Sequence, residues 1–451
     1  MAPAMPARSV VPGPRPTPLL GWRGNAIAFY RDPLGHVLRL HDTYGEVAAL
    51  AYADPAFVFA FGPDPQRQLL DQPLLFASAL QLSSAAEPPT DLPQQIPAEA
   101  LDRYGTVIGA LTEQVLDRWG AGRLVDVAYV MQQLTLRIAA LALLGQTQPP
   151  EVAQTASTLQ RWGDHLFAPP VTRMPVRAPA APLRRSQQQG QAVQHLIQTA
   201  ILGRGTRAEA DADGAFTLLA ALQPARLEAA DTTPALIGLV SRLLLVGSEL
   251  TAAGLAWTLF LLSQYPAILA DLGDELSGAL RGALPTVADL GRLPLLDRVL
   301  HESLRLLPPQ SLDLHCCTAP AQLGMYQLPA GAVVVGSPYL AQRQPEVYFA
   351  PHKFRPERWL YVEPSPAEFL PFGAGPGSEL STGLALVELK LILAQIVQRY
   401  RLALAPGVQV DRAARLTLVP KVGLSMIITR PSQPMIRREA HGTIRDLVAL
   451  G

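Results

Sequence analysis

The stretch FLPFGAGPGSELSTGLALVELKLILAQIVQRY, residues 369 to 400, decides the fold. It begins as a loop rich in Gly and Pro, and its backbone can lie close to a flat ligand because Gly373, Gly375 and Gly377 carry no Cβ. From Ser381 onward, apolar residues recur at the spacing of one helix face. The stretch therefore predicts a ligand-facing loop that leads directly into an apolar helix.

The opening Phe-Gly-Ala-Gly-Pro resembles the haem-binding loop of the cytochrome P450 superfamily. The pattern of that family is F-G-x-G-x-R-x-C-x-G, followed by a helix with Ala and Glu near its start. Laid on this sequence without a gap, the pattern is matched at Phe372, Gly373, Gly375, Ala385 and Glu388. The resemblance implies a mainly α protein with small β-sheets, folded as a cytochrome P450.

The same loop departs from the superfamily at the positions nearest the iron. Glu379 stands where the family has its axial Cys, Gly377 replaces the preceding Arg, and Ser381 replaces the closing Gly. A thiolate donates electron density that favours O–O cleavage, whereas a carboxylate is a hard oxygen ligand. Glu379 is a candidate metal ligand, but we favour a simpler role. A carboxylate near a helix start is stabilised by the free N–H groups and the helix dipole.

The composition indicates a large globular protein. With 451 residues, 49% of them hydrophobic and 16% charged, the chain can bury a large core as one domain or two. Lys+Arg and Asp+Glu each number 37, so the net charge is zero and no electrostatic footprint for nucleic acid is present. The two cysteines, Cys316 and Cys317, are adjacent, which disfavours an ordinary disulfide and fits a reducing compartment.

The domain organisation follows from the apolar and Pro-rich segments. The first 22 residues are Pro-rich and contain no apolar run long enough for a secretory signal or a membrane span. The apolar segment 234–262 is interrupted by Arg242 and Glu249, so we predict a cytoplasmic protein without a membrane span. We expect a Pro-rich leader at residues 1–22, a single cytochrome P450-like domain at 23–430 and a C-terminal extension at 431–451.

A helix that covers one face of the cofactor in the family has no counterpart here. The resemblance places a W-x-x-x-R helix, whose Trp and Arg bind a haem propionate, within residues 77 to 103. None of the five tryptophans falls in this range, and four prolines oppose a continuous helix before Ala98. We therefore expect this segment to be shortened.

The apolar helix at 234–262 resembles the long central helix of the superfamily. The family's A-G-x-E-T motif falls on residues 246–250, where Gly247 and Glu249 match. Leu250 replaces the alcohol that helps to deliver protons, and Thr251 comes one residue late, which at 100° per residue aims it elsewhere. Glu249 is a candidate proton relay, because a carboxylate in an apolar helix is costly unless it is used or paired. The alternative, a carboxylate satisfied by a neighbouring group or water, stays open.

Two further motifs resemble the family's structural lock. Glu302 and Arg305 form an E-x-x-R, whose i, i+3 spacing brings the two charges together on one helix face. The motif FRPERW supplies Arg358 ahead of the loop. Glu302, Arg305 and Arg358 resemble the buried Glu-Arg-Arg triad of the family, in which planar guanidinium groups suit bidentate pairing. The triad favours the fold and carries no information about haem.

His315 occupies the place of another cofactor-binding residue. In haem-binding relatives an Arg that pairs with a propionate follows the Pro-Pro by a few residues, and this place holds His315. His315 could donate a hydrogen bond to a propionate, and the neighbouring Cys316 or Cys317 could reach a metal. A Cys is more often a small buried hydrophobe, and no paired metal-ligand spacing is present.

The positions that differ from the family are those that bind or activate haem. The Glu-Arg-Arg triad, which supports folding, is kept. We therefore predict that no cofactor is bound. We also predict that the chain is a non-catalytic helper or binding protein of secondary metabolism. Its partner would be a protein such as a pathway transferase, by analogy with superfamily members that lack the Cys, and it could also bind a small hydrophobic ligand. The Pro/Arg-rich insert within residues 150–225 lies where the family has its substrate lid.

Two alternatives to the helper remain open. The first is a haem-binding monooxygenase of small hydrophobic molecules, with iron held by Glu379, His315 or solvent. The second is a haem-free carrier of a lipid or terpenoid.

Overall fold

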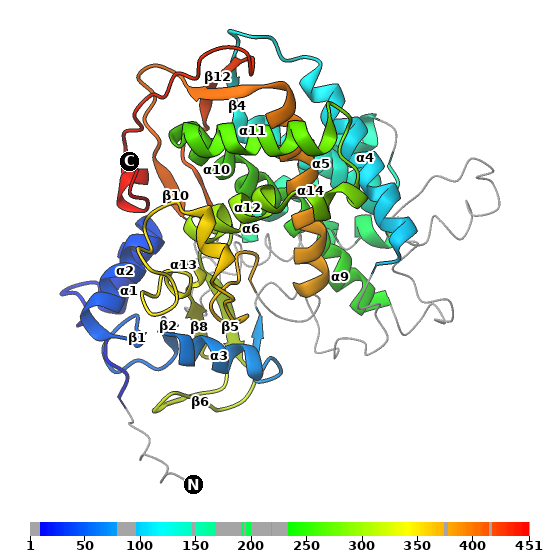
Figure 1. Ribbon diagram of the computed structural model, residues 1–451. Helices are drawn as coiled ribbons and strands as arrows, with labels where there is room; N and C mark the ends of the chain where they lie inside the picture. The colour runs from blue at the N-terminus through cyan, green and yellow to red at the C-terminus, as the bar shows by residue number, and fades with distance from the viewer. Residues whose placement is uncertain are drawn as a thin grey trace.

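The fold joins a large helical part to a smaller part rich in β-strands (Figure 1). The computed structural model describes residues 10–78, 96–146, 149–166, 191–193, 195–199, 218, 233–373, 378–414 and 417–450. The mainly α class with small sheets is confirmed. The α-helices are α1 (Trp22–Arg31), α2 (Pro33–Tyr44), α3 (Pro63–Asp71), α4 (Ala98–Leu116), α5 (Val127–Leu144), α6 (Pro149–Leu166), α9 (Thr233–Leu245), α10 (Thr251–Gln264), α11 (Pro266–Leu280), α12 (Pro294–Leu306), α13 (Pro338–Ala341) and α14 (Ser378–Arg399).

Short turns of other helix types connect several of these elements. The π-turn η2 (Val246–Leu250) joins α9 to α10 without a break, so the central helix runs from residue 233 to 264. The 3₁₀ turns are η3 (Val287–Arg292), η4 (Pro356–Leu360) and η5 (Thr443–Asp446). The last of these lies in the C-terminal extension, whose Ile444, Leu447 and Val448 are buried in the main core.

The strands form four small sheets. A five-stranded sheet has the order β1-β2-β8-β5-β3, and Asp54-Pro55 lies between the antiparallel strands β1 and β2. In this sheet β2 and β8 are parallel, while β3 pairs antiparallel with β5 and sets Ser78 opposite His315. The strands are β1 (Val47–Ala49), β2 (Phe57–Ala60), β3 (Phe76–Ser78), β4 (Leu124–Asp126), β5 (Asp313–Cys317), β6 (Ala321–Leu323), β7 (Tyr326–Leu328), β8 (Val333–Gly336), β9 (Arg401–Leu404), β10 (Arg412–Ala414), β11 (Leu418–Pro420) and β12 (Ser425–Thr429).

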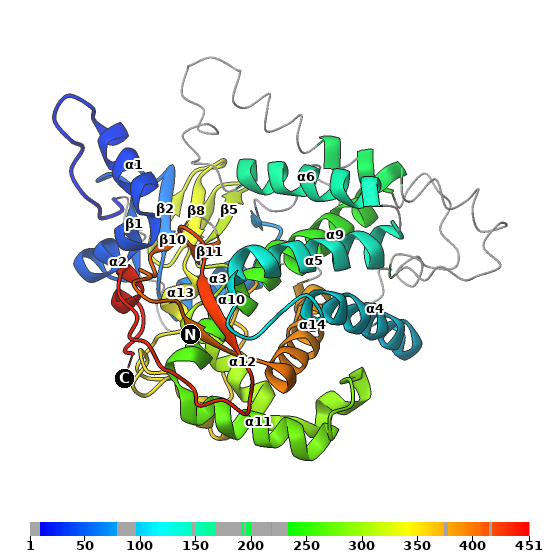
Figure 2. The same cartoon turned by 90° about the horizontal axis from the view of Figure 1, so that it is seen from above.

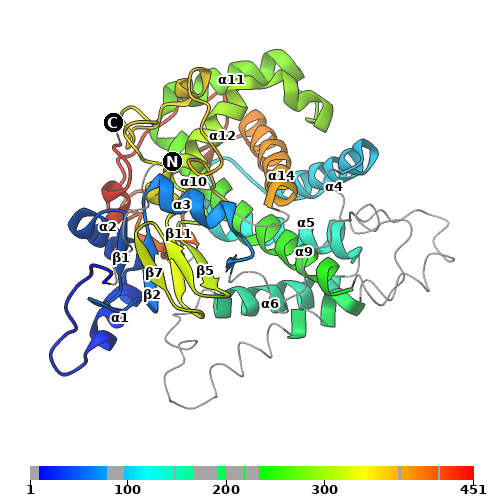
Figure 3. The ribbon, with the colours of Figure 1, turned by 90° about the horizontal axis from the view of Figure 1, so that it is seen from below.

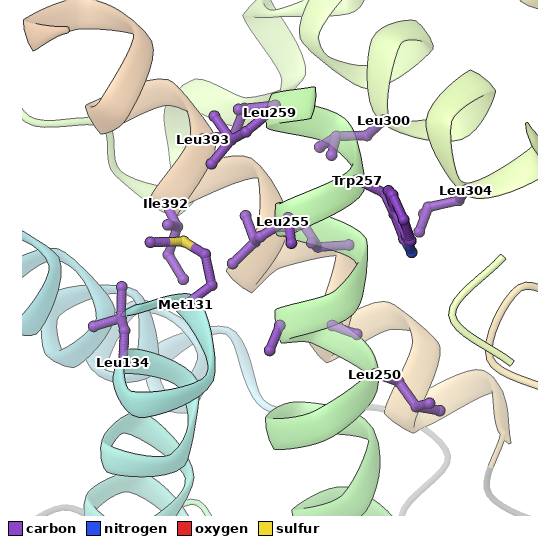
Figure 4. Close-up of a cluster of buried hydrophobic side chains, with 14 of the residues drawn as sticks. Met131, Leu134, Leu250, Leu255, Trp257, Leu259, Leu300, Leu304, Ile392 and Leu393 are labelled. Carbon is purple, nitrogen blue, oxygen red and sulfur yellow. The ribbon is translucent and has the colours of Figure 1, made fainter. Parts of the chain in front are cut away.

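The main core lies where α10 is surrounded by α5, α12 and α14. Figure 4 shows Met131 and Leu134 of α5, Leu255 of α10 and Ile392 of α14 directed toward one another. Every residue of α10 is buried, so its side chains pack on all sides and the helix is apolar all round. Trp257 is completely buried and satisfies its indole N–H by donating to the Leu418 carbonyl at 2.8 Å.

The apolar character of the longest helices is accounted for by this core. Three helical segments, Val127–Leu144, Ile237–Gln264 and Ser378–Arg399, are long and apolar enough to cross a membrane by length and composition. Between 61% and 89% of each apolar window is buried inside the protein. The apolar faces of these helices are therefore largely used in packing against one another.

Helix boundaries follow local signals that the sequence carries. α5 begins after Asp126, whose side chain accepts a hydrogen bond from the Tyr129 N–H, and it ends at Gly145. Gly145 adopts φ 66°, the left-handed conformation of a C-cap. α14 begins at Ser378, three residues before the predicted start at Ser381, because the Gly/Pro-rich run ends at residue 377.

One buried carboxylate joins α12 to the segment before the loop. Arg305 donates to both oxygens of Glu302 at 2.9 Å, and Arg358 donates to Oε1 at 2.9 Å. The indole N–H of Trp359 and the backbone N–H of Arg355 complete the set at 3.1 and 2.9 Å. The carboxylate of Glu302 is fully buried, so two guanidinium groups and two segments of chain, α12 and residues 355–359, depend on its charge.

A second buried carboxyl group lies between α4 and α14. The Tyr104 hydroxyl donates to Glu388 Oε2 at 2.8 Å, and both side chains are buried. Figure 2 shows these two helices side by side in the view from above. Burial raises the pKa of Glu388 from its ordinary 4.5 to about 8, although the hydrogen bond from Tyr104 lowers it in part. Glu388 therefore carries its proton at neutral pH.

We predict that Glu302→Gln lowers the free energy of unfolding by about 3–5 kcal/mol, because two buried guanidinium groups lose their counter-charge. Equilibrium urea unfolding of the full chain measures this loss. The control is Glu357→Gln, which removes an ion pair with Arg355 whose side chains are 53% and 39% exposed. That change should cost less than about 1 kcal/mol. Equal losses in the two variants would contradict a structural role for the Glu302 network.

We predict that Glu388 makes the protein less stable as the pH rises from about 5 to 8. The folded state binds the Glu388 proton more tightly than the unfolded state does, so stability is complete below pH 4.5 and falls through pH 8. Glu388→Gln should flatten this profile, by an amount on the order of a few kcal/mol, and its amide oxygen can still accept from Tyr104. Urea unfolding at several pH values measures the slope. Glu99→Gln, an exposed change in α4, should leave the slope as it is.

Candidate functional site

The loop before α14 is closely packed up to Gly373. Phe372 is buried, and Gly373 has φ +71°. A Cβ at Gly373 would lie 2.5 Å from the Gln310 amide, so this position requires glycine for both conformation and space. Gly375, predicted to face a cofactor, lies outside the described residues, which resume at Ser378.

Glu379, at the position of the family's axial Cys, is an exposed residue in the first turn of α14. A carboxylate in a first turn interacts favourably with the free N–H groups of the helix start. Among the residues that the structure describes, no group of three or more His, Cys, Asp and Glu side chains is arranged to hold a metal ion. The geometry supplies no partner ligand for Glu379 within the described chain.

Arg242 connects the central helix to the loop. Its Nε donates to Ser381 Oγ at 3.2 Å, and its Nη2 donates to the Phe372 carbonyl at 3.5 Å. Figure 3 shows α9, which carries Arg242, running between α6 and the start of α14. Burial lowers the pKa of Arg242, and the nearby Asp313 carboxylate opposes this effect. Sequence reasoning identified Arg242 only as an interruption of an apolar helix, and that interruption was the signal for this contact.

A set of buried polar side chains lies on β5 and just before it, next to the edge strand β3. Asp313 accepts from the Gln310 amide at 3.0 Å, and its other oxygen lies 3.2 Å from His315 Nε2. His315 Nδ1 lies 3.2 Å from the Phe76 carbonyl on β3. Burial lowers the pKa of His315, but Asp313 and the Phe76 carbonyl more than compensate, so the pKa is raised overall. Sequence reasoning identified His315 and missed Asp313, which pairs with it.

Glu249 and the matching Gly247 lie in the π-turn η2. The Gln132 amide of α5 donates to both oxygens of Glu249, at 3.1 and 3.3 Å. This contact corresponds to the alternative in which a neighbouring group satisfies the carboxylate. Gly247 faces α14, where a Cβ would lie 3.8 Å from Glu388 Oε2.

Thr251 shows where the helical periodicity fails. The prediction assumed 100° per residue through residues 246–250, but the structure has a π-turn there. A π-turn absorbs one additional residue within a helix. The Thr251 hydroxyl donates to the Val246 carbonyl, five residues back, at 2.8 Å. Thr251 thus follows Val246 as the fourth residue would in an α-helix, so the 100° per residue on which the prediction for Thr251 relied does not apply to this turn.

The two cysteines lie on β5, away from the loop. Cys317 is buried in the cluster that includes Phe76 and Val334, whereas Phe372 belongs to the main core. Burial raises the pKa of the Cys317 thiol to about 11, which keeps it protonated. Cys316 is exposed. Both cysteines are free thiols.

The described residues do not match those that a porphyrin needs. The resemblance places the cofactor between Gly247 and Glu379, and the Arg242 side chain crosses from α9 to the loop in this region. Asp313 puts a carboxylate beside His315, and a propionate at that place would meet a like charge. Glu379 offers a hard oxygen in place of a thiolate.

The overall fold nevertheless matches known haem proteins. The structure superimposes on the crystal structure of the cytochrome P450DA heme domain with a TM-score of 0.76 and 21% identity, over 97% of this chain and 100% of that one. Against the retinoic acid-bound cyanobacterial CYP120A1, the TM-score is 0.74 with 22% identity, over 95% and 100% of the two chains. These similarities confirm the predicted fold.

Sequence comparisons assign the family. The family model for cytochrome P450 matches residues 184–428. Cyclooctat-9-en-7-ol 5-monooxygenase of Streptomyces melanosporofaciens is 27% identical, over 90% of this chain and 94% of the relative. Cyclooctatin synthase of the same organism is 30% identical, over 70% of each chain. This chain belongs to the cytochrome P450 family.

Proposed function

We propose that this cytochrome P450 family member has lost haem-thiolate chemistry and acts as a non-catalytic helper or binding protein. The observation that carries the proposal is the replacement of the axial Cys by Glu379 in a chain whose two cysteines both lie on β5. Without a thiolate, the electron donation that favours O–O cleavage is missing.

The surroundings of Glu379 support the same proposal. The guanidinium of Arg242 bonds to the loop, and Asp313 pairs with the histidine that stands at the place of a propionate-binding Arg. A propionate beside His315 would lie next to the Asp313 carboxylate, and the repulsion between two like charges would oppose its binding. The two buried ion pairs of Glu302, with Arg305 and Arg358, are present and hold the scaffold together.

A helper needs a partner or a ligand. We propose a protein partner such as a transferase of the same pathway, acting in the cytoplasm, and a small hydrophobic molecule as ligand. Two relatives are named for cyclooctat-9-en-7-ol and cyclooctatin, so a hydrophobic cyclic alcohol is the ligand class that we would test first.

A second candidate is a haem-binding monooxygenase of small hydrophobic molecules. It is favoured by the relatives, one of which is named a monooxygenase and aligns over 90% of this chain. Iron would then be held without a Cys, by Glu379, His315 or solvent. His315 already contacts Asp313 and the Phe76 carbonyl, which leaves the exposed Glu379 as the protein ligand of this candidate.

An absorption spectrum of the purified full chain tests the proposal. We expect no Soret band in stoichiometric amount after expression with a haem precursor, and no shifted band after reduction and addition of CO. A cytochrome P450 that has its axial Cys, purified in parallel, is the positive control. A stoichiometric Soret band that disappears in Glu379→Ala would instead establish the second candidate.

A further inference from the structure

We propose that a built-in polar brace, formed by Arg242, Asp313, Gln310 and His315, takes the structural place of the cofactor in this chain. This inference rests on the proposed loss of haem. The brace connects α9, the loop 369–373, the start of α14 and the edge strand β3. We name these four residues the brace below.

The first step concerns the positive end of the brace. Arg242 reaches two segments that are more than 120 residues away in sequence, the loop carbonyl of Phe372 and the hydroxyl of Ser381. Ser381 donates in turn to the Ser378 carbonyl at 3.0 Å in the first turn of α14. A planar guanidinium with several donors suits this multiple contact, and a lysine would serve only one acceptor at a time.

The second step concerns the negative end. Asp313 is fully buried at the start of β5 and interacts with Gln310 on one oxygen and His315 on the other. A buried carboxylate is stable only when it is paired and hydrogen-bonded. Its charge also favours the charged form of Arg242. A side-chain carboxylate thus stands near the loop in a region where the resemblance expects a propionate carboxylate.

The third step shows that the two ends are mechanically joined. The Gln310 N–H donates to the Pro371 carbonyl at 3.0 Å, and its side chain packs against Gly373 where a Cβ would clash. His315 continues the path to the Phe76 carbonyl on β3. The path therefore runs from the edge of the sheet through Asp313 and the loop to Arg242 and α14. No bound group is needed to complete it.

A double-mutant cycle tests the brace on the full-length protein. Arg242→Met keeps an unbranched side chain and removes the guanidinium, and Asp313→Asn removes the carboxylate charge. We expect each change alone to lower the thermal unfolding midpoint by several degrees, and the second change to cost clearly less once the first is present. Arg67→Met is the control, because it removes an exposed ion pair on α3 and should leave the midpoint nearly unchanged. Additive losses, or an Arg242→Met midpoint equal to that of the control, would overturn the brace.

A haemin titration provides a readout that a merely stabilising contact would not move. We expect Glu379→Cys alone to take up little haemin, and Glu379→Cys with Arg242→Gly to take up at least about tenfold more per protein, seen as Soret absorbance after gel filtration. Arg242→Ala with Glu379→Cys serves as the second variant if the glycine variant fails to fold. It also removes the guanidinium and should take up haemin as the glycine variant does. Equal haemin uptake by Glu379→Cys with and without Arg242 would contradict the proposed role of the brace.

The two tests separate the brace from the proposed function. Haem in the unmodified protein would overturn both the loss of haem and the brace. An unmodified protein without haem, together with additive losses in the cycle, would overturn the brace alone.

Discussion

The position of the loop depends on the buried carboxylate of Glu302. Its two guanidinium partners fix α12 against residues 349–359, and the backbone of α12 then holds Gln342 through the Leu304 and Arg305 carbonyls at 2.9 and 3.1 Å. The side-chain amide oxygen of Gln342, Oε1, accepts from the Leu370 N–H at 2.8 Å. Because each of these contacts is buried and specific in geometry, the charge pairing around Glu302 determines where the loop 369–373 begins.

This dependence explains how the fold can persist while cofactor residues change. The Glu302 network touches backbone carbonyls and its own partners, and none of its hydrogen bonds requires a ligand. Glu379, in the first turn of α14, is exposed and lies outside this network. The residue type at position 379 therefore matters little to the scaffold, whereas loss of Glu302 would leave two buried guanidinium groups without their counter-charge.

Periodicity and motif spacing predicted the helices well, because α10 and α14 bury apolar residues over many turns. Motif spacing also named Glu302 and Arg305, which meet within one helix, and the family resemblance supplied Arg358, which lies 56 residues from Glu302 in sequence. The contacts of Arg242 could not be predicted, because Ser381 and Phe372 are remote from it in sequence. A serine hydroxyl and a backbone carbonyl also occur at many positions, so neither marks a partner for Arg242. The direction of the Thr251 side chain could not be predicted for another reason. One additional residue makes this turn a π-turn, so the assumed 100° per residue does not apply.

The choice of an arginine at position 242 is itself informative about energy and specificity. An unbranched apolar side chain such as methionine would fill much of the same space, so packing alone does not explain the arginine. An apolar side chain would, however, leave the Phe372 carbonyl and the Ser381 hydroxyl without these donors. It would also not fix the position of the loop relative to α9. Directional hydrogen bonds select one arrangement of packed segments where dispersion alone tolerates several. Arg242 therefore contributes to this fold chiefly by fixing the arrangement of the loop, and only secondarily by stabilising it.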